Sequence, residues 1–180
     1  MRKMANSNGL SVRIAVSADA PIIWDILKSE IEVMHQQGRD QWQYGYPNPS
    51  TVAADIEKHQ GRVLLKEDEV AGYCALVTSG EPNYSHIWDG EWLTKSTSSS
   101  SHYSVVHRIA INPNFTGQGL ATSFLLMLIE ESKSIGKESM RIDTNFDNAQ
   151  MLHILPKLGF TRCGKVMVSD GERIAFEKRF

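Results

Sequence analysis

VVHRIAINPNFTGQGLATSFLLMLIEE, the stretch from Val105 to Glu131, decides the fold of this chain because it joins a strand, a glycine turn and a helix directly. Its opening residues are rich in valine and isoleucine, which favours a strand. Asn112-Pro113 ends this strand, since proline lacks a ladder N–H and drives the residue before it into extended geometry. Thr116–Gly119 then leads into Leu120–Glu131, a run of helix-forming residues that predicts a helix.

The glycine turn predicts a binding site for a phosphate group. The first-turn N–H groups of a helix have no partner within the helix, and the helix dipole adds positive potential at the same end. Gly117 and Gly119 have no side chains that would keep a phosphate from the backbone, and they tolerate positive φ. Several amides that share one phosphate form strong charge-assisted hydrogen bonds. We therefore expect a pyrophosphate to bind at this turn.

Two common phosphate-binding motifs do not fit the sequence. The dinucleotide pattern G-x-G-x-x-G needs a glycine where this chain has Thr122. A partial match to the P-loop begins at Gly159 and ends at Val166, which has no hydroxyl group for magnesium. The residues after Val166 also predict a strand, whereas a P-loop is followed by a helix.

A third pattern, from Asn114 to Gly119, resembles the acetyl-coenzyme A loop of the GNAT acetyltransferases, Gln/Arg-x-x-Gly-x-Gly/Ala. Asn114 stands where the family usually has glutamine or arginine. Ile109–Pro113 is similar to the strand end before the family's loop. Further along, Asp143–Asn148 and Lys157–Phe160 are similar to the family's later helix and the turn that follows it. The resemblance covers roughly Val12 to Phe180.

The rest of the chain predicts alternating strands and helices. Alternating apolar residues, or β-branched runs between turn residues, predict strands at 10–16, 62–66, 70–78, 139–144, 160–169 and 173–180. Apolar residues at helical spacing predict helices at about 19–38, 50–59 and 145–155. The expected caps are Asp19, Ser50 or Thr51, and Asn145 or Asp147, and Pro156 should end or kink the last helix near Leu155.

These elements and the resemblance together predict a GNAT-like α/β fold. We expect a mixed, largely antiparallel twisted sheet of six to seven strands with helices on both faces. Residues 1–9 are predicted to form a disordered or extended tail, and residues 10–180 a single N-acetyltransferase domain. Ser79–Ser101 predicts a long irregular segment, and its serine tract, Ser96–Ser101, predicts a mobile loop.

Composition excludes several classes of function. The chain of 180 residues has 19 Lys and Arg against 21 Asp and Glu, so no broad basic surface for nucleic acid is expected. Residues 1–9 lack the apolar core of a signal sequence, and no apolar run has membrane-spanning length. We therefore expect a cytoplasmic protein that does not bind membranes. Cys74 and Cys163 lie far apart in apolar stretches, which predicts buried thiols and no metal site.

The resemblance implies acetyl-coenzyme A as the cofactor. In GNAT proteins the thioester lies along the strand before the loop, where the neighbouring strand splays away and backbone donors are available. This implies that Ile109–Ile111 contact the pantetheine arm and that Thr116–Thr122 bind the pyrophosphate. The cofactor residues implied in this way are Ile109, Ala110, Ile111, Thr116, Gly117, Gln118, Gly119, Leu120, Ala121, Thr122 and Asn148.

His107 is the predicted catalytic residue. Acyl transfer to an amine needs a proton acceptor, and histidine has a suitable pKa. Some GNAT members that acetylate arylalkylamines have a catalytic histidine at this place, whereas the alternative is a histidine that only packs on a strand. Leu155 stands where many members have a tyrosine that protonates the leaving thiolate. His153 or Tyr103 could replace it, or the thiolate could leave unassisted, so the general acid stays unassigned.

Trp42, Tyr44 and Trp88 are the predicted acceptor-binding residues, since the family places the acceptor near the first helical region and the long loop. Tyr46 and Trp92 are further candidates, and packing is the alternative for each of them. The predicted function is direct transfer of an acetyl group to a primary amine of a small molecule, peptide or protein. A non-catalytic acyl-coenzyme A binding module and a protein-interaction domain are the alternatives, and a homodimer agrees with the family.

Overall fold

The computed structural model describes residues 4–5, 9–95 and 102–180. Two compact units divide the chain: Met1–Leu76 with Arg108–Met127, and Val77–His107 with Leu128–Phe180. We call them the first unit and the second unit. Strand β5 (Tyr103–Ile111) and helix α3 (Leu120–Ser134) each contribute residues to both units.

The first unit begins with four strands and two helices. Its elements are β1 (Met4–Ala5), β2 (Leu10–Ile14), α1 (Ala20–Gln36), α2 (Pro49–Glu57), β3 (Gly61–Lys66) and β4 (Glu69–Val77), with short 3-10 helices η1 (Ser17–Asp19) and η3 (Pro113–Phe115). The strands pair in the order β1-β2-β3-β4, and each of these pairs is antiparallel. The end of β5 lies beside β4. Asn112, the residue directly after β5, donates its backbone N–H to the carbonyl of Ala71 on β4 at 2.9 Å.

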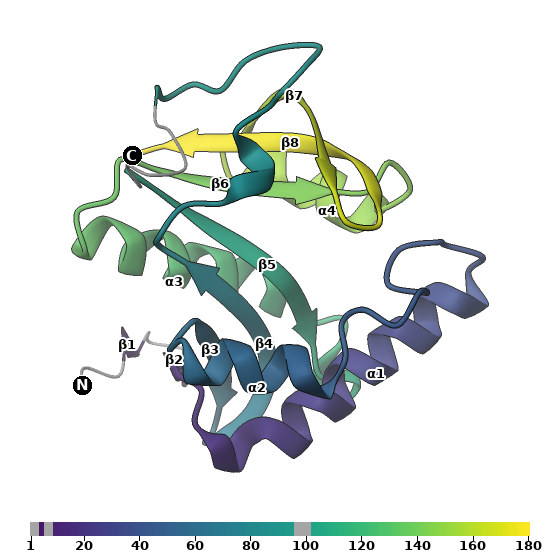
Figure 1. Cartoon of the computed structure of the whole chain (residues 1–180). Helices are drawn as coiled ribbons and strands as arrows, with labels where there is room; N and C mark the ends of the chain where they lie inside the picture. Colours follow the sequence, from purple (N-terminus) through teal and green to yellow (C-terminus); the bar gives the residue numbers. More distant parts are fainter. Residues whose placement is uncertain (1–3, 6–8, 96–101) are drawn as a thin grey trace. The chain divides into compact units, whose positions relative to one another are not determined.

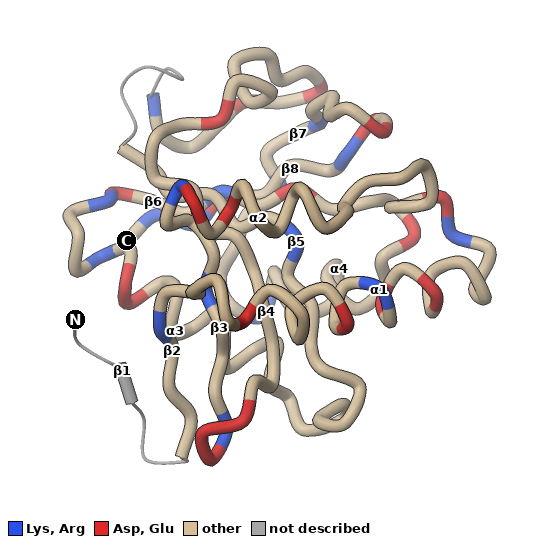
Figure 2. The backbone as a smooth tube through the Cα atoms, turned by 60° about the horizontal axis from the view of Figure 1, so that its bottom comes forward, with Lys and Arg blue, Asp and Glu red and all other residues tan. Residues whose placement is uncertain are grey.

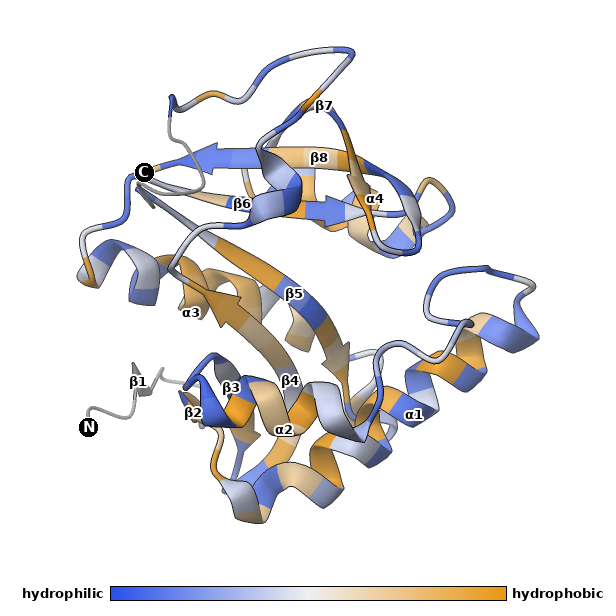
Figure 3. Ribbon diagram, in the orientation of Figure 1, coloured by the Kyte–Doolittle hydropathy of each residue, from blue (hydrophilic) through white to orange (hydrophobic). Residues whose placement is uncertain are grey.

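Helices α1 and α2 lie side by side and cover one face of these strands (Figure 1). Helix α1 buries Ile23, Ile26 and Leu27, whose spacing places them on one side of a helix, and Figure 3 shows its alternating apolar and polar bands. They pack with β-strand residues such as Val63. Leu64, which points to the opposite face of the strand, is also fully buried, so both faces of the sheet are covered.

The second unit contains η2 (Pro82–Tyr84), β6 (Ser139–Thr144), α4 (Ala149–Lys157), β7 (Thr161–Val168) and β8 (Gly171–Arg179). Its strand order is β5-β6-β8-β7, in which only the pair of β5 with β6 is parallel. The hairpin of β7 and β8 turns at Ser169-Asp170, where the Asp170-Gly171 pair predicted a turn.

The predicted fold class is confirmed. The described residues form seven strands of five or more residues, plus the two-residue β1, in a mixed and largely antiparallel arrangement flanked by helices. Met4 and Ala5 of the predicted tail pair with β2, whereas residues 1–3 and 6–8, and the serine tract 96–101, lie outside the described residues. That residues 10–180 act as one acetyltransferase domain stays a prediction.

Two predicted helix caps are wrong. Asn48, rather than Ser50 or Thr51, caps α2 by accepting the Thr51 N–H at 3.1 Å, because Pro49 fits the first helical position and the cap therefore precedes it. Asn148, rather than Asn145 or Asp147, caps α4 by accepting the Met151 N–H at 3.2 Å. Pro156 lies inside the last turn of α4, which continues to Lys157.

Cys74 and Cys163 are both buried, as predicted, and neither forms a disulfide bond within the described residues. No group of three or more His, Cys, Asp or Glu side chains that could hold a metal ion occurs among the described residues. Within the same residues, no helix is long and apolar enough to cross a membrane.

Gly90 provides the first testable prediction. It has a φ of 153°, and a Cβ atom there would lie 1.9 Å from the carbonyl oxygen of Cys163 on β7. We expect Gly90→Ala to lower the free energy of unfolding in urea by about 2–3 kcal/mol, through overpacking together with backbone strain. Gly136 is the matched control, because it has a positive φ of 78° and an added Cβ atom would meet nothing within 4 Å. Gly136→Ala should lower the free energy of unfolding by about 1 kcal/mol, from backbone strain alone. Equal losses of stability in the two variants would show that Gly90→Ala causes no clash.

Asp19 provides the second prediction. Two hydrogen bonds from Arg13, at 2.7 and 2.8 Å, together with one from the Val16 N–H, hold the pKa of Asp19 below its ordinary value. A carboxylate whose folded pKa is depressed stabilises the fold above its unfolded pKa of about 3.9, and this stabilisation is lost as the pH falls through the folded value. Asp19→Asn should therefore lower the free energy of unfolding at pH 7 by about 1 kcal/mol. In urea titrations the difference in free energy of unfolding between Asp19→Asn and the wild type should disappear below about pH 4. A difference that does not change with pH would contradict a stabilising role of the Asp19 charge.

Candidate functional site

The glycine loop of the first unit is exposed, and the space beside its two glycines is open. Gly117 and Gly119 have φ values of 74° and 68°, and a Cβ atom at either position would meet nothing within 4 Å. Residues 116–119 are exposed, and the 15-residue helix α3 begins immediately after them at Leu120. Glycine is thus needed here for its left-handed backbone, and the open space beside it adjoins the first-turn amides of a helix.

Asn112 fixes the start of the loop against β4. Its side chain accepts the Asn114 N–H at 3.0 Å and donates to the Val70 carbonyl at 2.9 Å. Close by, a Cβ at Gly72 would lie 3.1 Å from the carbonyl oxygen of Ala110. The backbone of β4 therefore lies close to that of Ala110, one of the predicted pantetheine-binding residues.

Lys66 brings a positive charge to the loop. It lies at the end of β3, where its ammonium group donates to the side-chain oxygen of Gln118 and sits 5.8 Å from the centre of the Phe115 ring. The acidic turn Glu67–Glu69 follows it in the sequence and is visible between β3 and β4 in Figure 2. Sequence reasoning missed Lys66, because only the pairing of the strands brings it to a loop that lies about 50 residues later.

Strand β5 has a polar interruption at His107 and Arg108, which Figure 3 shows as a hydrophilic segment of an otherwise apolar strand. Arg108 has a positive φ of 55°, and its side chain forms hydrogen bonds of 2.6 and 3.1 Å with both oxygens of Asp55 on α2. Its guanidinium group also donates to the Tyr46 hydroxyl, and Tyr73 donates to Asp55 at 2.5 Å. Burial, and then the charge of Asp55, raises the pKa of Tyr73, so this hydroxyl stays a neutral donor.

His107 lies in the second unit between two carboxylates. Its Nε2 atom is 2.7 Å from Oε2 of Glu81, and its Nδ1 atom is 3.9 Å from Oδ1 of Asp143. Tyr84 donates its hydroxyl to the same oxygen of Asp143 at 2.6 Å. Burial, and then the charge of Asp143, raises the pKa of Tyr84 well above its ordinary value, so Tyr84 is a permanent donor there. The His107 side chain keeps 19% of its surface exposed, which leaves it accessible to a reactant.

The pairing of β5 with β6 ends just before His107. The parallel register runs from Tyr103 with Ser139 to Val105 with Arg141, and His107 follows the last pair by two residues. The side chains of His107 and Asp143 can approach each other at this place, as their distance shows. The parallel pairing of β5 with β6 therefore does not extend to His107.

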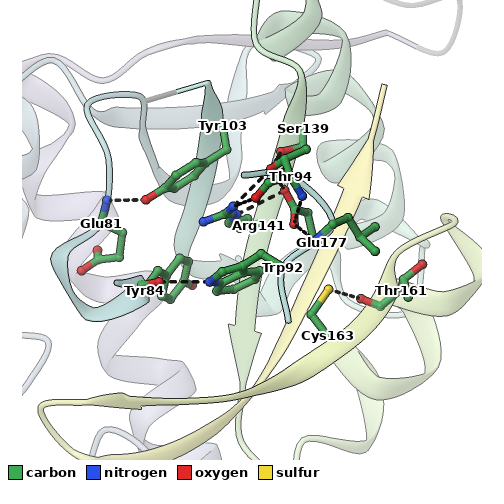
Figure 4. A network of polar contacts seen from close by, with 11 residues as sticks. Glu81, Tyr84, Trp92, Thr94, Tyr103, Ser139, Arg141, Thr161, Cys163 and Glu177 are labelled. Atoms are coloured by element: carbon green, nitrogen blue, oxygen red, sulfur yellow. Dashed lines mark hydrogen bonds and ion pairs between the residues drawn. The ribbon is translucent and has the colours of Figure 1, made fainter. Parts of the chain in front are cut away.

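The segment that carries Glu81 and Tyr84 is anchored at its far end (Figure 4). Leu93 and Thr94 donate their backbone N–H groups to Oε2 of Glu177 at 2.7 and 3.3 Å. Glu177 is fully buried and forms an ion pair with Arg141 at 3.2 Å. We call the described residues 79–95 the strap.

Aromatic residues extend this anchor. The guanidinium carbon of Arg141 lies 4.2 Å from the ring centre of Trp92 and 3.9 Å from that of Tyr103, so the cation is held between two rings (Figure 4). Trp92 in turn donates its indole N–H to the Tyr84 carbonyl at 3.0 Å. The sequence predicted an irregular segment here, but its described part is fixed by buried contacts.

The predicted acceptor-binding residues have different environments. Trp42 is 8% exposed and packs in the apolar core of the first unit, whereas Tyr44 is 76% exposed. Trp88 forms a backbone bridge with Lys165 of β7 in the second unit. Their role in acceptor binding stays a prediction.

The residues considered for the general acid also differ. Leu155 is fully buried, and His153 is exposed on α4. Tyr103 is buried, and its hydroxyl accepts the backbone N–H of Glu81 at 3.0 Å. Sequence reasoning missed Glu81 and Tyr84, since neither lies in a recognisable motif.

Comparison with known proteins agrees with this architecture. Residues 23–160 match the acetyltransferase (GNAT) family. The chain is 29% identical over 156 residues to L-amino acid N-acyltransferase MnaT from Escherichia coli (strain K12), covering 84% of this chain and 79% of that protein.

Solved structures show the same fold. A GNAT family acetyltransferase from Streptococcus agalactiae 2603 is 35% identical, with a TM-score of 0.87 and 96% of each chain covered. The yncA protein of Salmonella typhimurium, solved with its cofactor acetyl-CoA, has a TM-score of 0.67 at 20% identity, covering 96% of this chain and 94% of that one. The family match over most of the sequence, together with the strand, glycine loop and helix described above, shows that this chain belongs to the GNAT acetyltransferase family.

Proposed function

We propose that this GNAT acetyltransferase transfers the acetyl group of acetyl-coenzyme A directly to a primary amine, with His107 as the proton acceptor. The observation that carries the proposal is the partly exposed ring of His107. This residue lies on β5, the strand that leads into the glycine loop, and Glu81 of the strap holds its ring. A histidine that only filled space on a strand would not need a buried carboxylate partner.

The cofactor binds through the backbone in this proposal. Amides of Thr116–Thr122 bond the pyrophosphate, with the ammonium group of Lys66 adding a positive charge beside the loop. Backbone donors of Ile109–Ile111 bond the pantetheine arm and polarise the thioester carbonyl, which is the electrostatic help that acyl transfer needs. Asn148 is a further cofactor contact, although its side-chain oxygen already caps α4.

His107 makes the amine nucleophilic. An alkyl amine has a pKa of about 10, so roughly one molecule in a thousand is neutral at pH 7. The imidazole ring takes the proton, and the amine then attacks the thioester carbon. Because Leu155 cannot donate a proton, the thiolate leaves without help from a tyrosine at that position, which a thiol pKa of about 8.5 allows.

The acceptor is proposed to be a small cationic amine. Glu81 and Asp143 beside His107 give this part of the second unit a negative charge, which favours an ammonium group. The likeness to MnaT, which is named as an L-amino acid N-acyltransferase, supports a free amino compound as the acceptor. A cytoplasmic location and a homodimer stay predictions.

Leu155 supports one alternative, a module that binds acyl-coenzyme A without catalysis. This alternative predicts cofactor binding by calorimetry with no release of thiol on any acceptor. Turnover by the wild type on any amine of a panel would exclude it.

Gly119→Asp tests the loop. A carboxylate at this position would repel the pyrophosphate and fill the open space, so we expect the Kd for acetyl-coenzyme A in calorimetry to rise by at least about 100-fold. Gly136→Asp is the matched control, because Gly136 has a similar positive φ and open surroundings elsewhere. The Kd of Gly136→Asp should stay within about twofold of the wild-type value. Equal affinity of the two variants for acetyl-coenzyme A would show that the glycine loop does not bind the cofactor.

His107→Gln tests the proton acceptor. We expect kcat for acetyl transfer to fall by about 10²–10⁴-fold, the usual size of general-base catalysis, while the Kd for acetyl-coenzyme A stays unchanged. His102→Gln is the control, since His102 is an exposed histidine that also faces a glutamate. A kcat for His107→Gln within about threefold of the wild type would contradict the assignment.

A further inference from the structure

We infer that Glu81 is a positioning residue that fixes His107 with Nδ1 as the atom that takes the proton from the acceptor. This inference rests on the proposed function and adds to it the atom that reacts and the residue that selects this atom. Neither Glu81 nor the strap that carries it belongs to the glycine loop or to the strand end before that loop.

Three contacts fix Glu81. Its backbone N–H donates to the Tyr103 hydroxyl at 3.0 Å, which holds the main chain. Its Oε1 atom accepts the Asn83 N–H at 3.1 Å, as the cap of η2. Its Oε2 atom is the one that reaches Nε2 of His107, at 2.7 Å. The side chain is 13% exposed, so it has little freedom to turn away.

This geometry selects one tautomer of His107. An ionised carboxylate can only accept hydrogen bonds, so at 2.7 Å the hydrogen must lie on Nε2. In the neutral ring Nδ1 then carries the lone pair. The Asp143 oxygen is 3.9 Å from Nδ1, which is too far for a direct hydrogen bond, so Nδ1 keeps its lone pair for a reactant.

Tyr84 orients Asp143 toward the ring. The Tyr84 hydroxyl donates to the same Oδ1 atom that faces Nδ1, at 2.6 Å. The Asp143 carboxylate therefore attracts an ammonium group that approaches Nδ1 and stabilises the ring once it is charged. The charged ring is bonded by Glu81 on one side and faces Asp143 on the other.

The strap keeps Glu81 and Tyr84 in place. Beyond Tyr84, Trp92 returns a hydrogen bond to the Tyr84 carbonyl, and Thr94 is bonded to the buried Glu177 (Figure 4). Glu81 and the tyrosine that orients Asp143 thus come from a segment with buried anchors, which is what a site needs to hold a ring in one orientation.

Every proton is accounted for in the proposed reaction. An acceptor ammonium gives one proton to Nδ1, so that His107 carries hydrogens on both ring nitrogens. The neutral amine forms the new C–N bond, and the C–S bond breaks with its electron pair on sulfur. The ring gives its proton to this sulfur, which yields the thiol of coenzyme A, and the new amide nitrogen releases one proton to water.

Nitrogen NMR of the His107 ring tests the tautomer without any turnover. We expect the neutral ring of the wild type to carry its hydrogen on Nε2, and this hydrogen should exchange slowly with water. In Glu81→Ala this slow exchange should be lost, whereas Glu138→Ala should not change it. Glu138 is the matched control, because it faces His102 at 3.6 Å as an exposed pair. A wild-type ring with its hydrogen on Nδ1 would overturn the inference.

Kinetics test the positioning role. Glu81→Gln keeps an oxygen that can cap η2 but removes the charge, so we expect kcat to fall by about 10- to 100-fold with the acceptor KM and the Kd for acetyl-coenzyme A nearly unchanged. Added formate should restore part of the rate of Glu81→Ala, and it should not change the rate of Glu138→Ala. A rate of Glu81→Gln within about twofold of the wild type would overturn the inference, as would a loss confined to KM.

The two proposals fail in different ways. If the wild type acetylates no amine of the panel, the proposed function fails, and the NMR result on the ring still stands. If the wild type turns over and His107→Gln is impaired while Glu81→Gln is not, only the inference about Glu81 fails. Urea unfolding of each Glu81 variant detects a folding defect. Recovery of the rate on addition of formate indicates a defect in positioning, because formate does not restore a lost fold.

Discussion

Charged and polar side chains on a largely buried strand must be paired, and this constraint shapes both units of the protein. Strand β5 carries His107 and Arg108, one in each unit, and they are paired by Glu81 of the strap and Asp55 of α2. Arg108 and Asp55 are both less than 10% exposed, so loss of either leaves a buried charge without its partner. The His107 side chain is more exposed, at 19%, so the fold depends less on its pairing with Glu81 than on the pair of Arg108 and Asp55. This difference agrees with the proposed role of Glu81 in orienting His107, whereas the Asp55 pair stabilises the fold.

Local sequence patterns predicted much of the fold. The strand, loop and helix from Val105 to Glu131 were predicted because each element has its own signal: β-branched residues, then proline and glycine, then helix formers. The final hairpin followed from the Asp170-Gly171 pair. Caps were less predictable, since Asn48 and the residues after it include several cap-forming side chains and only the position of Pro49 decides between them.

The partners within the site could not be predicted in this way. Glu81 lies 26 residues from His107, so no local pattern links the members of this pair. The strap showed only aromatic residues and serines, which are typical of loops, and its order depends on the buried ion pair of Arg141 and Glu177. Trp42, chosen for an acceptor pocket because of its aromatic ring, is buried because its apolar bulk packs with the core around α1. The partner of His107, the order of the strap and the burial of Trp42 all depend on tertiary packing, which local sequence patterns do not reveal.

The leucine at position 155 has a consequence for how the proposed reaction ends. Tyr84 is a buried hydroxyl in contact with Asp143, but its raised pKa and its bond to that carboxylate make it a poor acid. If His107 accepts the proton of the acceptor, it becomes the group of this cluster best able to give a proton back. The charged ring then serves as the acid for the thiolate as well as the base for the amine, and Glu81 holds it through both steps. A single residue that performs both steps removes the need for a tyrosine in place of Leu155.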